Sequence, residues 1–120
     1  MTDADFTGAN FSGTVFRGVV LINSNFNRAN FNNTEFIEYV NLGVADFSHS
    51  TFKNADFTRC DFLSIRDTNF SNCDLSNSEF PAKDCIRCEK SNFSKANLIN
   101  TNFHSVIDLT QVIIGSQTII

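Results

Sequence analysis

The fold is decided by residues 4–36, which read ADFTGANFSGTVFRGVVLINSNFNRANFNNTEF. In this stretch Phe or Leu recurs at every fifth position, and a small residue usually stands two positions before it. The position between these two is most often Asp or Asn. All fourteen phenylalanines of the 120-residue chain occupy the same place in this repeat. We call that place the centre, and the places two and one before it the small position and the preceding position.

A period of five fits neither common secondary structure. Side chains of a strand alternate with a period of two, and those of a helix return to one face after about 3.6 residues. Neither element would keep residues five apart on one side. The sequence therefore predicts a solenoid in which each pentapeptide forms one short side that ends in a turn. The centre and the small position are expected to point inward, and the other three positions outward.

Four segments carry a resemblance to a known family: ADFTG (4–8), ANFNN (29–33), ADFTR (55–59) and ANLIN (96–100). They resemble the A-(D/N)-(L/F)-x-x unit of pentapeptide repeat proteins, and the resemblance covers about residues 4–105. It implies the family's fold, an all-β solenoid that forms a right-handed quadrilateral β-helix, here of about five coils. We expect a single domain over residues 1–120, with regular repeats over about 4–105 and an apolar C-terminal end over 106–120.

Charge and hydropathy exclude several classes of function. Thirteen acidic and nine basic residues give a net charge of −4, so nucleic acid is not expected as a direct partner. No apolar run approaches the ~20 residues of a membrane span. The first repeat begins at Ala4, which leaves no room for a signal peptide. We therefore expect a cytoplasmic protein that contacts no membrane.

Counting four pentapeptides per coil sorts the centres into four columns. Three columns consist mainly of Phe. The fourth column is predicted to contain Leu21, Leu42, Phe62, Cys85 and Leu109. The repeat is interrupted beside these pentapeptides, near Tyr39, at residues 65–67, at residues 88–90 and near Val106. The fourth side is therefore predicted to be irregular.

Apolar residues at expected outward positions gather on the same fourth side, among charged residues. Two interpretations stay open. The extra residues let some of these side chains fold inward, or the side chains form an exposed apolar stripe with a polar rim, which is typical of a partner surface. Under the second interpretation the partner-binding residues are Ile22, Val44, Leu63, Arg66, Ile86 and Arg87.

The composition changes after Phe103, where aliphatic residues replace Phe. Leu109, Ile114 and Ile119 keep the period of five. A solenoid end exposes unpaired backbone and core, so it needs a cap or a second subunit. Homodimerisation through a solenoid end is therefore expected as one form of association.

The sequence offers no catalytic constellation, so we predict that the chain is not an enzyme. A convex rod has no cleft in which a nucleophile, a base and an orienting group converge. Cys60 and Cys73 occupy small positions and are expected to be buried and reduced. Cys85 and Cys88 form a lone C-x-x-C, whereas structural zinc takes four ligands. No metal and no cofactor are predicted, and zinc or redox chemistry at this pair is the alternative.

The leading functional prediction is a non-enzymatic protein-interaction scaffold with a protein partner of unknown identity. The resemblance supplies an alternative, because in the Qnr and MfpA quinolone-resistance members an acidic rod imitates duplex DNA and occupies gyrase or a related topoisomerase. The acids that fit this alternative are Glu35, Asp56, Asp61, Glu79 and Asp84. The other interpretation of the acids is that Asp and Asn at the preceding position bond nearby backbone in turns.

Overall fold

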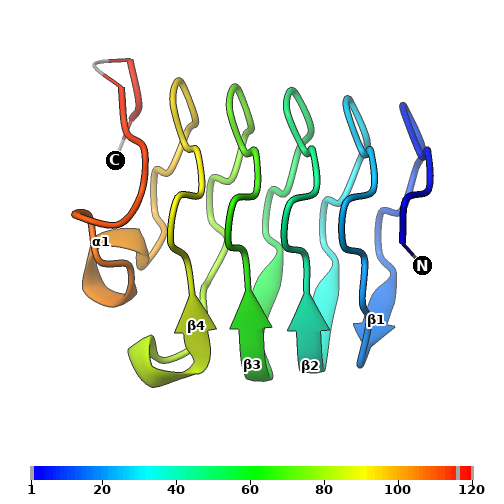
Figure 1. The fold of residues 1–120 in the computed structure, drawn as a ribbon, viewed down its shortest axis with the longest axis horizontal. Helices are drawn as coiled ribbons and strands as arrows, with labels where there is room; N and C mark the ends of the chain where they lie inside the picture. Colours follow the sequence, from blue (N-terminus) through cyan, green and yellow to red (C-terminus); the bar gives the residue numbers. More distant parts are fainter. Residues whose placement is uncertain (1, 116, 120) are drawn as a thin grey trace.

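The computed structural model describes residues 2–115 and 117–119. Within them, a sheet of four parallel strands has the order β1 (Val15–Arg17), β2 (Glu35–Asn41), β3 (Asp56–Ser64) and β4 (Ile86–Arg87). A short 3₁₀ helix, η1 (Lys83–Cys85), precedes β4, and a single helical turn, α1 (Phe103–Val106), comes later. Consecutive strands lie side by side one turn of the chain apart, so the architecture fits a β-helix (Figure 1).

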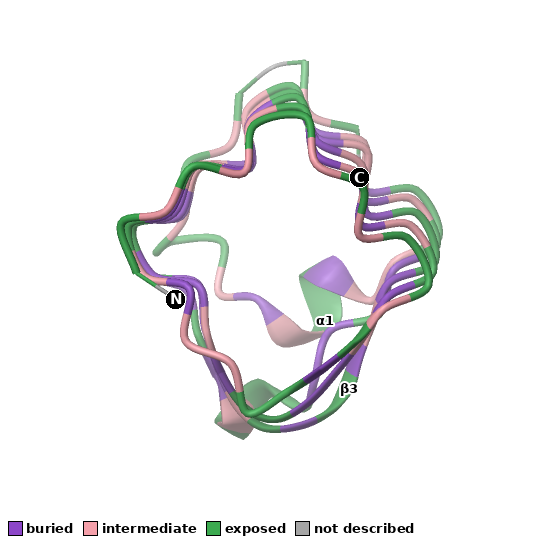
Figure 2. Ribbon diagram, turned by 90° about the vertical axis from the view of Figure 1, so that its right-hand side faces the viewer, coloured by how far each residue is buried: buried purple, intermediate pink, exposed green. Residues whose placement is uncertain are grey.

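Parallel bridges continue the pairing outside the named strands. One column of bridges takes one member from each turn and joins Asp5, Asn25, Asp46, Asn69 and Asn92. The bonds alternate in direction: Phe6 donates its amide to the carbonyl of Asn25 at 2.7 Å, and Asn25 donates its own to Ala4 at 2.8 Å. Successive turns superimpose when viewed along the axis (Figure 2). The backbone N–H and C=O groups of each turn are thus paired by hydrogen bonds with those of the next turn.

Phenylalanine centres fill the core in three columns, as the five-residue period predicts. Rings of consecutive turns stack, and the centroids of Phe31 and Phe52 lie 4.7 Å apart with an interplanar angle of 4°. Rings of neighbouring columns meet edge to face, as Phe47 and Phe52 do at 5.3 Å and 66°. Aromatic quadrupoles favour both arrangements. The inward placement of the centres is therefore confirmed for these three columns.

Each regular side ends in a residue with left-handed backbone, two positions after the centre. Asn33, Asn54 and Asn77 have φ of 59°, 60° and 60°, a conformation that suits glycine and asparagine best. The side chain at the preceding position supports the same turn, since Asp46 Oδ1 accepts the amide of Ser48 at 2.9 Å. Asparagines at this position accept the corresponding bond elsewhere. The turn interpretation of Asp and Asn is confirmed.

The predicted fourth column is wrong beyond Leu42. Arg59, two positions after Phe57, lacks left-handed backbone, and the chain continues there as β3 instead of turning. The amide of Leu42 donates to the carbonyl of Ser64 at 2.8 Å, one residue before Ile65. By this register the column contains Leu21, Leu42, Ile65 and Cys88, and the predicted centres Phe62 and Cys85 do not belong to it. The extra residues precede the centres and do not lie at residues 65–67 and 88–90.

Large apolar residues fill the small positions of this fourth side. They are Val19, Val40, Leu63 and Ile86. Val40 and Leu63 are fully buried, and Ile86 is 9% exposed. Leu, Ile and Cys centres occupy less volume than Phe, so larger neighbours fill space that a Phe ring would otherwise take. Leu63 and Ile86 therefore fold inward, and the expected exposed stripe does not include them.

The C-terminal end also departs from the predicted repeat. After Phe103 the chain forms α1 and buries Ile107, whereas the predicted centre Leu109 is 43% exposed. Ile119 pairs with Asn97, which occupies a preceding position, so Ile119 points outward and is not a centre. Ile120, part of the expected apolar end, lies outside the described residues.

Helical structure is scarce in the chain. Among residues 2–115 and 117–119, no helix is long and apolar enough to cross a membrane.

We predict that Phe52→Ala lowers the free energy of unfolding by about 3–5 kcal/mol, because it leaves a cavity between stacked rings. Phe62→Ala is the matched control, since Phe62 lies outside the core and its loss should cost roughly 1 kcal/mol or less. Chemical denaturation of both variants measures the difference. Equal losses in the two variants would contradict the assignment of Phe52 to the core.

Candidate functional site

The four predicted partner-binding residues that stay outside the core lie on or beside the fourth side, each in a different turn of the solenoid. Ile22, half-buried, and Arg66, exposed, each follow a centre of the fourth side directly. Val44 lies in the turn itself and is 53% exposed. Arg87 is exposed on β4. The continuous apolar stripe that the sequence suggested is not formed, and a role of these four residues in partner binding stays a prediction.

An aromatic pair that the sequence analysis missed stands on the outer face of the sheet. Tyr39 of β2 and Phe62 of β3 are paired in register, and their rings stack at 5.3 Å with an interplanar angle of 10°. Tyr39 is 47% exposed and Phe62 half-buried. Alternation along the strands turns both rings outward, because the next residues, Val40 and Leu63, are buried.

The sequence did contain a signal for this arrangement. The interval from Phe47 to Phe70 equals the interval from Phe57 to Phe80, and both exceed four pentapeptides, so the extra residues lie between Phe57 and Phe70. From Leu42 the same interval leads to Ile65 and leaves Phe62 outside the column. The strict period of phenylalanine concealed this, because Phe62 occupies the fifth position after Phe57.

Charged side chains stand on the strands that carry the aromatic pair and on the neighbouring β1. Arg17 of β1 pairs with Glu38 of β2, and Arg59 of β3 pairs with Glu35 of β2. These exposed pairs contribute little to folding, but they give the aromatic pair a polar rim.

Three of the predicted DNA-mimic acids form a row. Parallel bridges place Glu35, Asp56 and Glu79 one above another on the third side. The row is partly occupied by internal contacts, since Glu35 pairs with Arg59 and Asp56 Oδ1 accepts the amide of Thr58 at 2.8 Å.

The other two predicted acids do not extend this row. Asp61 and Asp84 are exposed, and within the described part of the chain neither makes an ion pair. They stand before Phe62 and Cys85, which are not centres of the fourth column, so the expected second acidic row is not formed by preceding positions.

Three of the four cysteines, Cys60, Cys73 and Cys88, are buried, and Cys85 is half-buried. Cys73 occupies a small position, and its thiol donates to the carbonyl of Phe47 at 2.9 Å. Burial raises the pKa of the Cys73 and Cys60 thiols to about 12, so both stay protonated at neutral pH. Cys88 is a buried centre and Cys85 is half-buried. Among the described residues, no group of three or more His, Cys, Asp or Glu could hold a metal.

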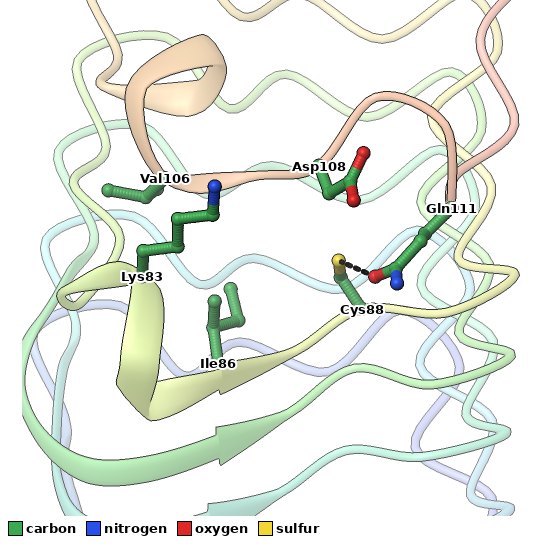
Figure 3. Close-up of a pocket in the computed structure, with 6 residues that line it drawn as sticks. All are labelled: Lys83, Ile86, Cys88, Val106, Asp108 and Gln111. Carbon is green, nitrogen blue, oxygen red and sulfur yellow. Dashed lines mark hydrogen bonds between the residues drawn. The ribbon is translucent and has the colours of Figure 1, made fainter.

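A pocket of about 160 Å³ opens beside Cys88, where α1 takes the place of a regular side (Figure 3). It is lined by Lys83, Ile86, Cys88, Val106, Asp108 and Gln111. The pocket joins residues of η1 and β4 to the segment that follows Phe103. No sequence signal predicted it, because that segment leaves the five-residue repeat.

Hydrogen bonds within the pocket wall fix two of its polar groups. Asp108 Oδ1 accepts the hydroxyl and the amide of Thr110 at 2.6 and 3.0 Å. These bonds, with a smaller contribution from Lys83, hold the pKa of Asp108 below its usual value. The Cys88 thiol donates to Gln111 Oε1 at 3.8 Å, and burial raises the pKa of this thiol. The pocket therefore presents a carboxylate and a neutral thiol.

Val44 combines exposure with an unusual backbone. Its φ is 61°, where the equivalent turn residues Asn23, Asp67 and Lys90 have φ of 60°, 55° and 61°. Among these four only Val44 is β-branched, and a β-branched side chain is a genuine outlier in the left-handed region. Left-handed backbone disfavours valine in this exposed turn, and backbone strain of this kind motivates a hypothesis of function.

Comparison with known proteins gives a family match. A family model for pentapeptide repeats matches residues 1–36 and 38–62, about half of the chain, with eight copies. The comparison with curated proteins finds no match.

Among solved structures, the chain is similar to a pentapeptide repeat protein of the Arabidopsis thaliana thylakoid lumen, with 22% identity over 79% of this chain and 65% of that chain and a TM-score of 0.40. It is also similar to trypsin-treated QnrB1, a plasmid-mediated fluoroquinolone resistance protein, with 20% identity, 93% and 57% coverage and a TM-score of 0.41. A third similar structure is the pentapeptide repeat protein Rfr23 of the cyanobacterium Cyanothece 51142. The identity is 18% over 99% of this chain and 62% of that chain, and the TM-score is 0.29. The chain spans less than two thirds of each of these structures.

We predict that Val44→Asn raises the free energy of unfolding by about 1 kcal/mol, because asparagine tolerates left-handed backbone better than valine. Asn54→Val is the matched control, because Asn54 also has left-handed backbone in a turn. This substitution should lower the free energy of unfolding by a similar amount. Denaturant unfolding of both variants tests the pair. Loss of stability in Val44→Asn would show that the valine side chain makes contacts that outweigh its strain.

Proposed function

The chain belongs to the pentapeptide repeat family, and from that premise we propose that it is a non-enzymatic protein-interaction scaffold. Its partner surface is the outer face of β2 and β3, around Tyr39 and Phe62. The partner is a protein whose identity the face does not specify. The predictions that it resides in the cytoplasm and associates with itself through a solenoid end remain untested.

The finer geometry of the scaffold is part of the same proposal. We infer a right-handed quadrilateral β-helix of about five coils that forms one domain over residues 1–120. Support comes from four columns of inward side chains and from the parallel bridges that join each turn to the next. Family membership adds the shape that other pentapeptide repeats adopt.

The observation that carries the proposed interface is the exposed, stacked pair of Tyr39 and Phe62. Both rings stand on paired strands whose next residues, Val40 and Leu63, are anchored in the core. Anchoring restricts the rings before any partner binds, so binding costs them little conformational entropy. Aromatic residues at the centre of a polar rim are typical of binding hot spots.

The proposal that the scaffold is not an enzyme rests on the state of its nucleophiles. Thiolate is the reactive form of cysteine, and burial raises the pKa of Cys60, Cys73 and Cys88. His49 and His104 are exposed on the surface of the solenoid. Among the described residues, these buried cysteines are therefore not activated nucleophiles, which supports a role in binding.

DNA mimicry of the quinolone-resistance type is the second candidate, and the row of Glu35, Asp56 and Glu79 favours it. Parallel pairing spaces their backbones at about 4.8 Å, which keeps three carboxylates close on one face. The ion pair from Arg59 to Glu35 weakens the row, and the turn role of Asp56 gives its carboxylate a structural purpose. We therefore rank this candidate below the aromatic interface.

We predict that Tyr39→Thr with Phe62→Thr abolishes capture of the partner from the cytosol of the source cell, while threonine keeps the strands folded. The matched control, Val15→Thr with Ile99→Thr, removes two exposed apolar residues elsewhere, which are 55% and 43% exposed in the parent. Quantitative affinity capture compares both variants with the parent. Retained capture by the first variant, or loss in both, would place the interface elsewhere.

The second candidate is tested by gyrase supercoiling in the presence of the purified protein. We expect no inhibition by the parent chain. If inhibition occurs, mimicry requires that Glu35→Gln, Asp56→Asn and Glu79→Gln together remove it, because negative charge is what imitates phosphate. Asparagine at position 56 still offers Oδ1 to Thr58, so the triple variant should melt close to the parent. Inhibition that depends on these charges would reverse the ranking of the two candidates.

A further inference from the structure

The pocket beside Cys88 holds opposite charges that do not pair with each other. Lys83 and Asp108 both line it (Figure 3). Within the described part of the chain, neither takes part in an ion pair at 4.0 Å or less. Lys83 is nevertheless near enough to contribute to the lowered pKa of Asp108. The pocket therefore keeps an ammonium and a carboxylate apart on its walls.

The remaining lining residues divide into an apolar part and a polar part. Ile86 and Val106 provide aliphatic surface. Gln111 orients its amide oxygen toward the Cys88 thiol. In the described residues its amide nitrogen donates to no group that the structure records, so two N–H donors remain for a ligand. The pocket thus offers a cation, an amide donor, an anion and an apolar wall together.

Size restricts what can occupy this space. About 160 Å³ is well above the ~30 Å³ that one water molecule takes in the liquid. It is below the ~300 Å³ at which pockets for drug-sized ligands begin. A small organic molecule fits, whereas a nucleotide or a peptide does not. Lys83 is exposed and Asp108 half-buried, so both charges remain accessible, and a ligand that carries both signs can pair with each of them.

We propose that this pocket binds a small zwitterion of the class of short α-amino acids with an apolar side chain. The ligand carboxylate pairs with Lys83 and accepts from the amide of Gln111. The ligand ammonium pairs with Asp108, and its side chain rests on Ile86 and Val106. This inference is independent of the protein-interaction surface, which lies at Tyr39 and Phe62.

L-valine is the probe that tests the assignment, by titration into isotopically labelled protein with backbone amide shifts as the readout. We expect saturable shifts centred on Ile86, Cys88, Val106 and Gln111. Two analogues each lack one charge: 3-methylbutanoate has no ammonium, and isobutylamine has no carboxylate. Each should bind about ten-fold more weakly, since each analogue loses one of the two charge-assisted hydrogen bonds.

Two variants test the residues. Lys83→Gln and Asp108→Asn should each weaken valine binding about ten-fold, and asparagine retains an oxygen for the Thr110 bonds. Lys95→Gln is the control, because Lys95 is an exposed lysine that does not line the pocket. It should bind valine as the parent does. If a variant fails to fold, the two analogues still decide the question on the parent protein.

Three outcomes would overturn the proposal. Valine could cause no saturable shifts, or shifts that lie away from the pocket. Either analogue could bind as well as valine, which would mean that one charge is irrelevant. Affinity could also be unchanged in both Lys83→Gln and Asp108→Asn, which would mean that these two groups simply face solvent.

Discussion

Phenylalanine rings of consecutive turns stack with centroids 4.5–5.8 Å apart, except Phe80 and Phe103, which meet edge to face, and the rest of the structure depends on this contact. Stacking requires the same register in all columns of a turn. A change of chain length on one side must therefore be matched around the whole turn. This is why the step from Phe47 to Phe70 in one column equals the step from Leu42 to Ile65 in another. The stacked core therefore fixes how many residues each turn contains.

The fourth side lengthens most where the left-handed turn after the third-side centre is lost, at Arg59 and at Ala82, although β2 already continues past the left-handed Glu38. Where Asn54 bends the chain, Arg59 continues in β3, and additional residues are needed to reach the next centre. The additional residues form the strands β2 and β3, whereas the regular sides pair mostly through isolated bridges. Strand alternation then brings Tyr39 and Phe62 to the outside while Val40 and Leu63 replace part of the missing aromatic core. The exposed aromatic pair is thus a consequence of how the backbone crosses from one column to the next.

Acidic residues in this chain serve backbone geometry as well as charge. Asp46, Asp56 and Asp74 each accept an amide two residues on, as asparagines do at equivalent places. An acidic composition therefore arises without selection for an anionic surface. The pocket is different, because Asp108 faces Lys83 across a cavity where the repeat has ended. There the Asp108 carboxylate accepts the turn bonds from Thr110 and also lines the pocket.

The sequence by itself determined the solenoid and the inward phenylalanines of three columns, because both depend on local periodicity, whereas hydrogen bonds in the structure decided that Asp and Asn support the turns. It also determined that Cys73 is buried, since its position is small in every coil. Only the tertiary structure decided that Leu63 and Ile86 fold inward and that Phe62 faces outward. The period of five was equally compatible with Phe62 or Ile65 as a centre, and hydrogen bonds between neighbouring turns made the choice. The pocket likewise depended on tertiary structure, because Lys83 and Asp108 meet only through the path of the chain after Phe103.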